Sequence, residues 1–143
     1  MDFLSALQIS GSGLSAQRTR VTIAASNLAN AESTRGPDGQ PYHRHDPVLA
    51  AVPFADALST ASGGGPQVAG VAVTEVVEDK SPGHKVYLPG HPDADPNGFV
   101  TFPNVNPVNE TVNLMSASRG YDANATAVET LKTMAQRALD IAR

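Results

Sequence analysis

The sequence predicts a mainly α-helical protein in which two long terminal helices pair antiparallel, as in a coiled coil, around a small β insertion. At both ends of the 143-residue chain, apolar residues recur at alternating steps of three and four, the spacing of an apolar stripe on a helix. The middle is instead rich in proline, glycine and short alternating runs. We expect one domain, with an N-terminal helix over 1–30, an extended and β-hairpin region over 31–106 and a C-terminal helix over 107–143.

The N-terminal helix is predicted from its stripe, which contains one glycine and one arginine: Leu4, Leu7, Gly11, Leu14, Arg18, Val21, Ala25 and Leu28. A second row runs beside it with seven-residue spacing: Ile9, Ala16 and Ile23. The run Ser10–Gly13 contains two glycines, each of which costs a helix about 0.5–1 kcal/mol relative to alanine. They indicate either a kink or break, or a place where a neighbouring helix approaches closely, and the sequence leaves both readings open.

The β insertion begins with a strong turn signal at Gly36–Gly39. Tyr42–Val52 reads as an extended segment, and Pro47 would make it an edge strand because proline cannot donate to a ladder. Residues near 53–70 are rich in alanine, glycine and serine, which predicts a flexible loop. Gly70–Asp79 alternates valines and is the best strand candidate. Two shorter extended pieces follow: His84–Leu88 and Phe99–Phe102.

The C-terminal helix is predicted to begin with Asn106 as its cap and Pro107 at the first helical position, where proline is tolerated. Its stripe is the longer of the two: Leu114, Ala117, Tyr121, Asn124, Val128, Leu131, Ala135, Ala138 and Ala142. A second row lies alongside: Gly120, Ala127, Met134 and Ile141. Two helices with double rows cannot cover each other fully, and apolar surface left exposed usually marks an interface.

Composition excludes several classes of function. The chain has no cysteine, so a disulfide framework, thiol chemistry and a zinc–thiolate site are all excluded. The net charge is −4 with no basic run, which argues against a nucleic-acid partner. We expect no membrane-spanning segment and no cleaved signal peptide, because no apolar stretch has the required length. No phosphate-binding loop or nucleophile motif is present, so we expect neither an enzyme nor a small-molecule substrate, cofactor or metal.

One chemical alternative is a small metal-dependent hydrolase that uses His43, His45, Asp93 and Asp95. The two histidines, two residues apart on a strand, would share one face and could form a metal pair. An exposed polar edge explains the same residues. The run that starts at Asp93 also resembles the opening of a calcium loop, but its twelfth position is Asn104 where a bidentate glutamate is required. Turn chemistry accounts for it better.

The chain resembles the bacterial flagellar basal-body rod protein family. The N-terminal stretch Ile9–Thr34 is similar to the family's signature, with four residues at its motif positions: Asn27, Ala29, Asn30 and Thr34. The run from Gly36 to Tyr42 and the block over residues 86–124 also match members of the family, and the latter is the most specific block. The chain departs from the pattern at Gly11, where alanine is expected, and at Leu114, where methionine is expected.

This resemblance implies a structural subunit of the proximal part of the flagellar rod, which carries torque from the motor's membrane ring to the hook. Partners would be other rod subunits, copies of the same chain and the flagellar type III export apparatus. The location would be the periplasmic basal body, reached without a cleaved signal. The terminal helices would pack between subunits as coiled coils. The remaining alternative is a soluble helical adaptor dimer.

The apolar rows therefore supply the candidate subunit-interface residues: Leu4, Leu7, Leu14, Val21, Leu28, Asn30, Leu114, Tyr121, Val128, Leu131, Met134 and Ala138.

Overall fold

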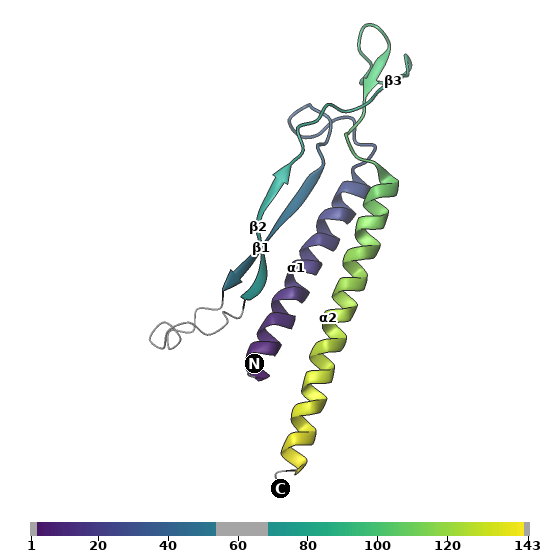
Figure 1. Cartoon of the computed structure of the whole chain (residues 1–143). Helices are drawn as coiled ribbons and strands as arrows, with labels where there is room; N and C mark the ends of the chain where they lie inside the picture. Colours follow the sequence, from purple (N-terminus) through teal and green to yellow (C-terminus); the bar gives the residue numbers. More distant parts are fainter. Residues whose placement is uncertain (1–2, 54–68, 142–143) are drawn as a thin grey trace.

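A computed structural model describes residues 3–53 and 69–141 and confirms the mainly helical class. In chain order the elements are α1 (Phe3–Ala29), β1 (His45–Pro53), β2 (Ala69–Glu78), β3 (Lys85–Tyr87), β4 (Phe99–Thr101) and α2 (Pro107–Ile141). The two helices lie side by side and antiparallel (Figure 1). The β1–β2 hairpin runs along α1 on the side away from α2, and β3 with β4 forms a tip beyond the end where α1 stops and α2 starts.

Side-chain caps fix the ends of both helices. The Asn106 Oδ1 accepts hydrogen bonds from the backbone N–H groups of Val108 at 3.0 Å and Asn109 at 3.3 Å. This confirms the predicted cap, with Pro107 as the first helical residue. At the other helix end, the Asn30 Nδ2 donates at 2.9 Å to a carbonyl oxygen one turn back in α1. Both chain reversals at the tip end of the molecule are therefore set locally.

The glycines in α1 do not break the helix, which runs uninterrupted from Phe3 to Ala29. Gly13 lies against α2, where an added Cβ would meet the Asn124 Nδ2 at 2.9 Å. Gly120 of α2 makes the reciprocal contact, since its added Cβ would lie 3.0 Å from the Gln17 Cδ. Gly11 has open space around it. Close approach of a neighbouring helix is therefore the correct reading for Gly13, and the neighbour is in the same chain.

The side of α1 that packs inward is not the predicted stripe. Its buried residues form a row of small or polar side chains: Gly13, Ala16, Ala24 and Asn27. At 100° per residue this row lies roughly 140° around the helix axis from the stripe that begins at Leu4. The α2 stripe does face α1, because it contains the fully buried Ala117 and the Asn124 that covers Gly13. Small residues allow the two backbones to approach, which leucines would prevent.

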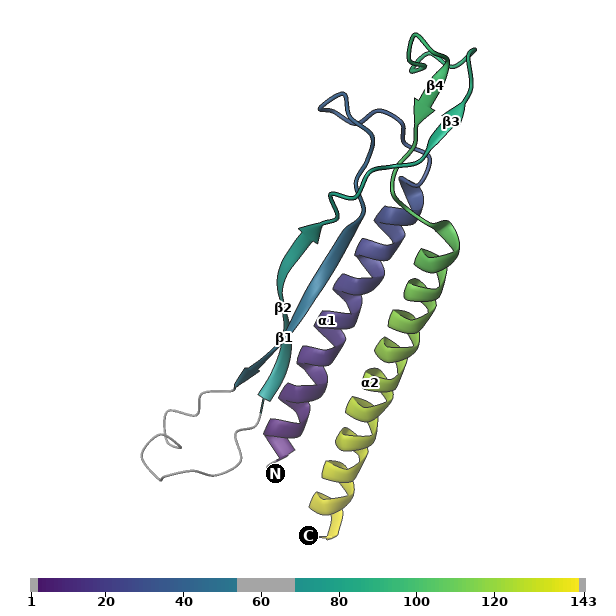
Figure 2. The same ribbon diagram turned by 45° about the horizontal axis from the view of Figure 1, so that its top comes forward.

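The pairing also leaves one end of α2 without a neighbouring helix. Gly13 lies opposite Asn124 and Asn27 opposite Glu110, so the helices keep a constant register. Continued along the pair, this register carries the last turns of α2 past the start of α1, as Figure 2 shows. The end of α2 carries three exposed apolar side chains: Met134, Leu139 and Ile141.

The predicted strands are present with small shifts in their ends. β1 and β2 pair antiparallel, and the proline at position 47 lies in a strand with no further neighbour in its sheet, as expected for an edge. The loop predicted near 53–70 loses its ends to the hairpin, because Pro53 pairs with Ala69 and Val52 with Gly70. The remaining residues of that predicted loop lie outside the described part of the chain. Ser12 ties the hairpin to α1, since its Oγ accepts from the Val71 backbone N–H at 3.1 Å.

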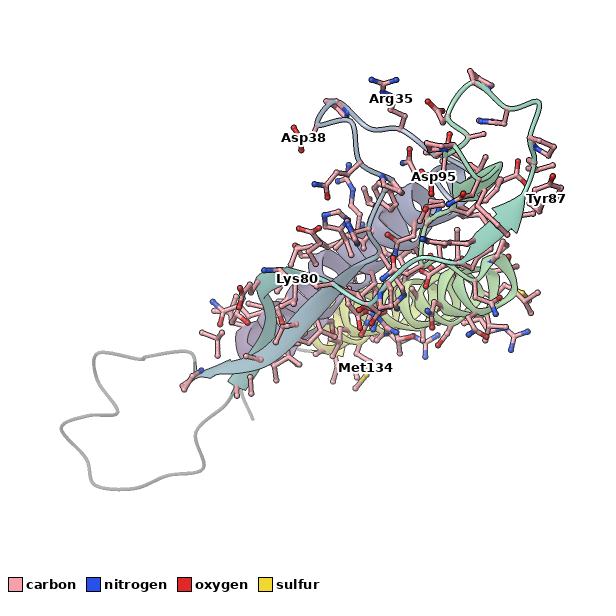
Figure 3. The ribbon with its side chains drawn as sticks, turned by 90° about the horizontal axis from the view of Figure 1, so that it is seen from above. Arg35, Asp38, Lys80, Tyr87, Asp95 and Met134 are labelled. Carbon is pink, nitrogen blue, oxygen red and sulfur yellow. The ribbon has the colours of Figure 1, made fainter. Side chains whose placement is uncertain are left out.

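The tip is a short antiparallel pair with exposed aromatic rings. Tyr87 and Phe99 are cross-strand partners whose rings meet edge-on at 5.3 Å. Gly98 turns the chain into β4 with a φ of 79°, and its backbone N–H donates to the Asp95 carbonyl at 2.7 Å. This confirms that the calcium-like run is a turn. In Figure 3, Tyr87 stands at the outer edge of the tip.

The buried interior is small for a chain of this length. Among the described residues, the buried apolar positions are Ala16, Ala24, Ala31, Val100, Val105 and Ala117. No leucine in the described segments is buried. Neither described helix has the combination of length and apolar character needed to cross a bilayer. Most of the large apolar side chains therefore remain at the surface of the single chain, which is unusual for an isolated domain.

The two α1 glycines provide a matched test of the helix contact. We expect Gly13→Leu to lower the free energy of unfolding by about 2 kcal/mol or more, because overpacking forces the helices apart. Gly11→Leu should leave stability equal or higher, because it replaces glycine in open space. Urea unfolding followed by circular dichroism measures both. Equal loss in the two variants would show that Gly13 is not a contact point.

Candidate functional site: exposed apolar faces held by a buried polar junction

Asn27 connects three elements near the tip end of the molecule. Its side chain is 1% exposed. The Nδ2 donates to the His45 carbonyl at 2.8 Å and to the Glu110 Oε2 at 3.1 Å. The Oδ1 accepts from the His45 backbone N–H at 3.0 Å and from the Tyr42 hydroxyl at 2.9 Å. Every hydrogen-bonding position of the amide is thus used, and α1, β1 and α2 meet at one side chain.

Glu110 brings a buried charge to the same place. This first-turn residue of α2 is 2% exposed, and its Oε1 accepts from the Arg44 Nε at 2.7 Å. That hydrogen bond raises the pKa of Arg44 above its ordinary value, although burial opposes the rise. The guanidinium also pairs with Asp46 at 3.3 Å. Arg44 therefore stays charged at any pH at which the fold exists, and the Glu110 carboxylate is not left alone in the interior.

Asn104 extends this connection to the chain beyond the hairpin. Its Oδ1 accepts from the Arg44 backbone N–H at 2.8 Å, and its Nδ2 donates to the Asp79 carbonyl at 2.8 Å. The Asp79 carboxylate itself accepts from the hydroxyl and backbone N–H of Ser81, which lowers its pKa. We call Asn27, Tyr42, Arg44, Asn104 and Glu110 the polar junction. It fixes how the hairpin and the tip are set on the helix pair.

The sequence analysis did not identify the polar junction. Asn27 was noted only as a motif residue, and Glu110 and Arg44 were not singled out. A signal existed, because an asparagine inside a helix is unfavourable unless its side chain has a partner. An acidic residue in the first turn of a helix is ordinarily explained by the helix dipole, which hides a tertiary role.

The predicted interface residues lie on exposed or half-exposed surface in the single chain. Leu4 at 63%, Met134 at 61%, Tyr121 at 40% and Ala138 are exposed. The others are half-buried: Leu7, Leu14, Val21, Leu28, Asn30, Leu114, Val128 and Leu131. The part of the set on α2 shares the side that faces α1, whereas the part on α1 faces away from α2. Figure 3 shows Met134 projecting from the flank of the molecule.

Sequence reasoning missed three further apolar patches. One follows the outer side of α2 through Val108 at 70%, Val112 at 59% and Met115 at 50% exposed. A second lies on the hairpin: Val48, Leu49, Val52, Val76 and Val77. The third is the tip: Val86, Tyr87, Leu88 and Phe99. The pattern of steps over residues 108–115 would have revealed the first patch, but the others depend on which strand face the fold covers.

The residues of the hydrolase hypothesis do not form a metal site. His45 contacts the Tyr42 hydroxyl through its Nδ1 at 2.9 Å, and His43 precedes the strand rather than sharing a strand face with it. Asp93 instead pairs with Arg35 at 3.5 Å and accepts from the Thr34 hydroxyl at 2.9 Å. Within residues 3–53 and 69–141 no cluster of three or more metal-ligating side chains is found. The hydrolase alternative therefore has no support.

Comparison with known proteins gives the same direction. Residues 7–37 match the model described as flagella basal body rod protein, and residues 97–141 match flagellar basal body rod FlgEFG protein C-terminal. The flagellar basal-body rod protein FlgC of Salmonella typhimurium is 46% identical over 99% of this chain and 98% of its own length. The chain belongs to the flagellar basal-body rod protein family. FlgC of Bacillus subtilis is 40% identical over the whole of both chains.

Membership of the rod family explains the layout of the site. The two matched regions cover α1 with its following turn and the tip strand β4 with α2, so they contain both helices and most of the polar junction. The resemblance to FlgC-like rod proteins is therefore confirmed along the full chain. For a rod protein the candidate functional site is a set of packing faces, and the polar junction holds those faces in fixed orientation.

The polar junction can be tested by a conservative change. We expect Glu110→Gln to lower the free energy of unfolding by about 3 kcal/mol, because it leaves the Arg44 charge with a weakened set of partners in the interior. Glu129→Gln, an exposed position on the same helix, should change it by less than about 0.5 kcal/mol. Urea unfolding of both variants decides. A change at Glu110 no larger than at Glu129 would contradict a structural role for the ion pair.

Proposed function

We propose that this chain is a structural subunit of the proximal part of the bacterial flagellar rod. It would assemble with copies of itself and with other rod subunits through its terminal helices. The observation that carries the proposal is the placement of large apolar side chains outside the fold while alanines and glycines fill the interior. A chain with this distribution gains most of its apolar burial only when neighbours cover it.

The elongated shape suits a role in carrying torque. Two helices cross-braced by small-residue contacts and joined to a hairpin give a stiff element along its whole length (Figure 1). Rod subunits that pass load from the motor ring to the hook need this stiffness and a large lateral surface. The polar junction would keep the hairpin and tip from rotating on the helices under that load.

Export and location are finer parts of the same proposal. The subunit would leave the cytoplasm through the flagellar type III export apparatus without a cleaved signal and assemble in the periplasm. The chain has no cysteine, so its folding after export needs no disulfide formation. The scarcity of large buried side chains fits a chain that folds fully only on arrival. No catalytic activity is part of the proposal.

The adaptor-dimer alternative makes a different use of the same faces. A discrete dimer covers one face and stops, whereas a rod subunit needs several faces on different sides of the molecule. The exposed apolar side chains occur on both helices, the hairpin and the tip, so they favour multiple neighbours. Sedimentation of the purified chain as a single small oligomer at all concentrations would favour the adaptor.

Met134 gives the sharpest test of assembly. Because it is 61% exposed in the single chain, we expect Met134→Asp to leave the subunit folded and exported. If a neighbour covers this position, the buried carboxylate costs several kcal/mol and the rod should fail to form. Gln136→Asp places the same charge two residues away and should be tolerated. The measurement is fractionation of subunit between soluble periplasm and basal bodies, together with swimming. Normal rods with Met134→Asp would mean that this position faces solvent.

A further inference from the structure

One side of α1 forms a basic apolar stripe without a partner in the described chain. The stripe, which we call the α1 stripe, consists of Leu4, Leu7, Gly11, Leu14, Arg18, Val21, Ala25 and Leu28. It faces away from the row that packs on α2. Arg18 is exposed at its centre, and no ion pair to Arg18 occurs among the described residues. Across Phe3–Ala29 the helix has two arginines and no acidic residue, so this surface is positive.

The outer face of the hairpin has the opposite charge. The register pairs Asp46 with Val77 and Val48 with Glu75, and residues two apart in a strand share a face. All four side chains are therefore on one face, and all four are exposed. We call this set the hairpin face. Val48 and Val77 are 43% and 42% exposed, and no ion pair to Glu75 is found within the described segments.

We propose that the hairpin face of one copy packs on the α1 stripe of a second copy, with Glu75 beside Arg18. This inference rests on the proposed function and names the partner and the contact residues. Each surface combines apolar side chains with a charge of one sign, and the two signs are opposite. Complementary charge of this kind fixes register and partner choice in an interface, while the apolar atoms supply the burial.

The spacings on the two surfaces match. With Glu75 beside Arg18, Val77 lies about 6.6 Å further along its strand. Leu14 lies about 6 Å from Arg18 along the helix in one direction, and Val21 about 4.5 Å in the other. In either direction a valine of the hairpin meets an apolar residue of the stripe. Gly11 leaves an open hollow one step beyond Leu14, where a neighbouring side chain can enter.

The proposed contact joins two different surfaces, so it cannot close on itself as a twofold dimer. A heterologous contact repeats from copy to copy and gives an open helical array or a ring. Both surfaces lie away from the α1–α2 contact and remain available after the chain has folded. The hairpin would then be the element that reaches from one copy to the next, and the α1 stripe its receptor.

Disulfide trapping tests the contact directly, because the natural chain has no cysteine. The experiment compares cells that carry Leu14→Cys with Val77→Cys in one chain and cells that carry Val21→Cys with Val77→Cys. After oxidation of intact cells, one of the two pairs should give a ladder of covalent multimers. Thr126→Cys with Val77→Cys is the matched control, since Thr126 is exposed on α2, and it should stay monomeric.

Charge reversal supplies a second readout that does not need cysteine. Arg18→Glu and Glu75→Arg should each reduce the amount of subunit in basal bodies by roughly fivefold, the upper end for one exposed pair. The double variant, with both charges exchanged, should recover most of the loss. Lys132→Glu, a reversal elsewhere on the surface, should have no such rescue when combined with Glu75→Arg.

The outcomes separate this inference from the proposed function. Subunit recovered in basal bodies, with neither ladder nor charge rescue, would overturn the hairpin contact and leave the rod assignment intact. A cross-linked band that contains a different protein would overturn the choice of a second copy as partner. Wild-type subunit absent from basal bodies would overturn the proposed function and this inference together.

Discussion

The hydrogen bonds of Asn27 are the constraint on which the rest of the structure depends. One amide, 1% exposed, joins the end of α1 to the start of β1 and to the first turn of α2. Buried polar groups are costly unless each has its partner, so only one relative position of these three elements satisfies them all. The Arg44–Glu110 ion pair adds a charge to the same requirement. Specificity of arrangement, rather than bulk burial, is what the junction provides.

Small residues complete what the polar junction begins. Gly13 and Gly120 each receive an amide side chain from the opposite helix, and Ala16 and Ala117 are almost wholly buried between them. The backbones approach closely, and the helix pair is held along its length without large side chains. The consequence is that leucines and methionines are left for other contacts. A fold that places its alanines inside and its leucines outside is suited to an assembly.

The surfaces of the molecule therefore carry its function, and a pocket does not. The patches on α1, α2, the hairpin and the tip point in several directions, as Figures 1 and 3 show together. Each is oriented by the polar junction or by the helix contact, so a change at Asn27 or Gly13 would disturb faces far from itself. Membership of the rod family is consistent with this design, because a rod subunit needs several fixed faces at once.

The sequence by itself determined the elements, their order and the family. The periodic stripes located both helices, and Asn106 with Pro107 gave the start of α2. Local patterns sufficed because caps, turns and amphipathic periodicity are short-range effects. Only the tertiary structure decided which side of α1 packs inward. A stripe of leucines and a row of alanines are both compatible with a helix contact, and the choice between them depends on Asn27 and Gly13 meeting α2. The polar junction was equally out of reach, because Asn27, Arg44 and Glu110 are far apart in the chain and acquire their meaning only when the fold brings them within hydrogen-bond distance.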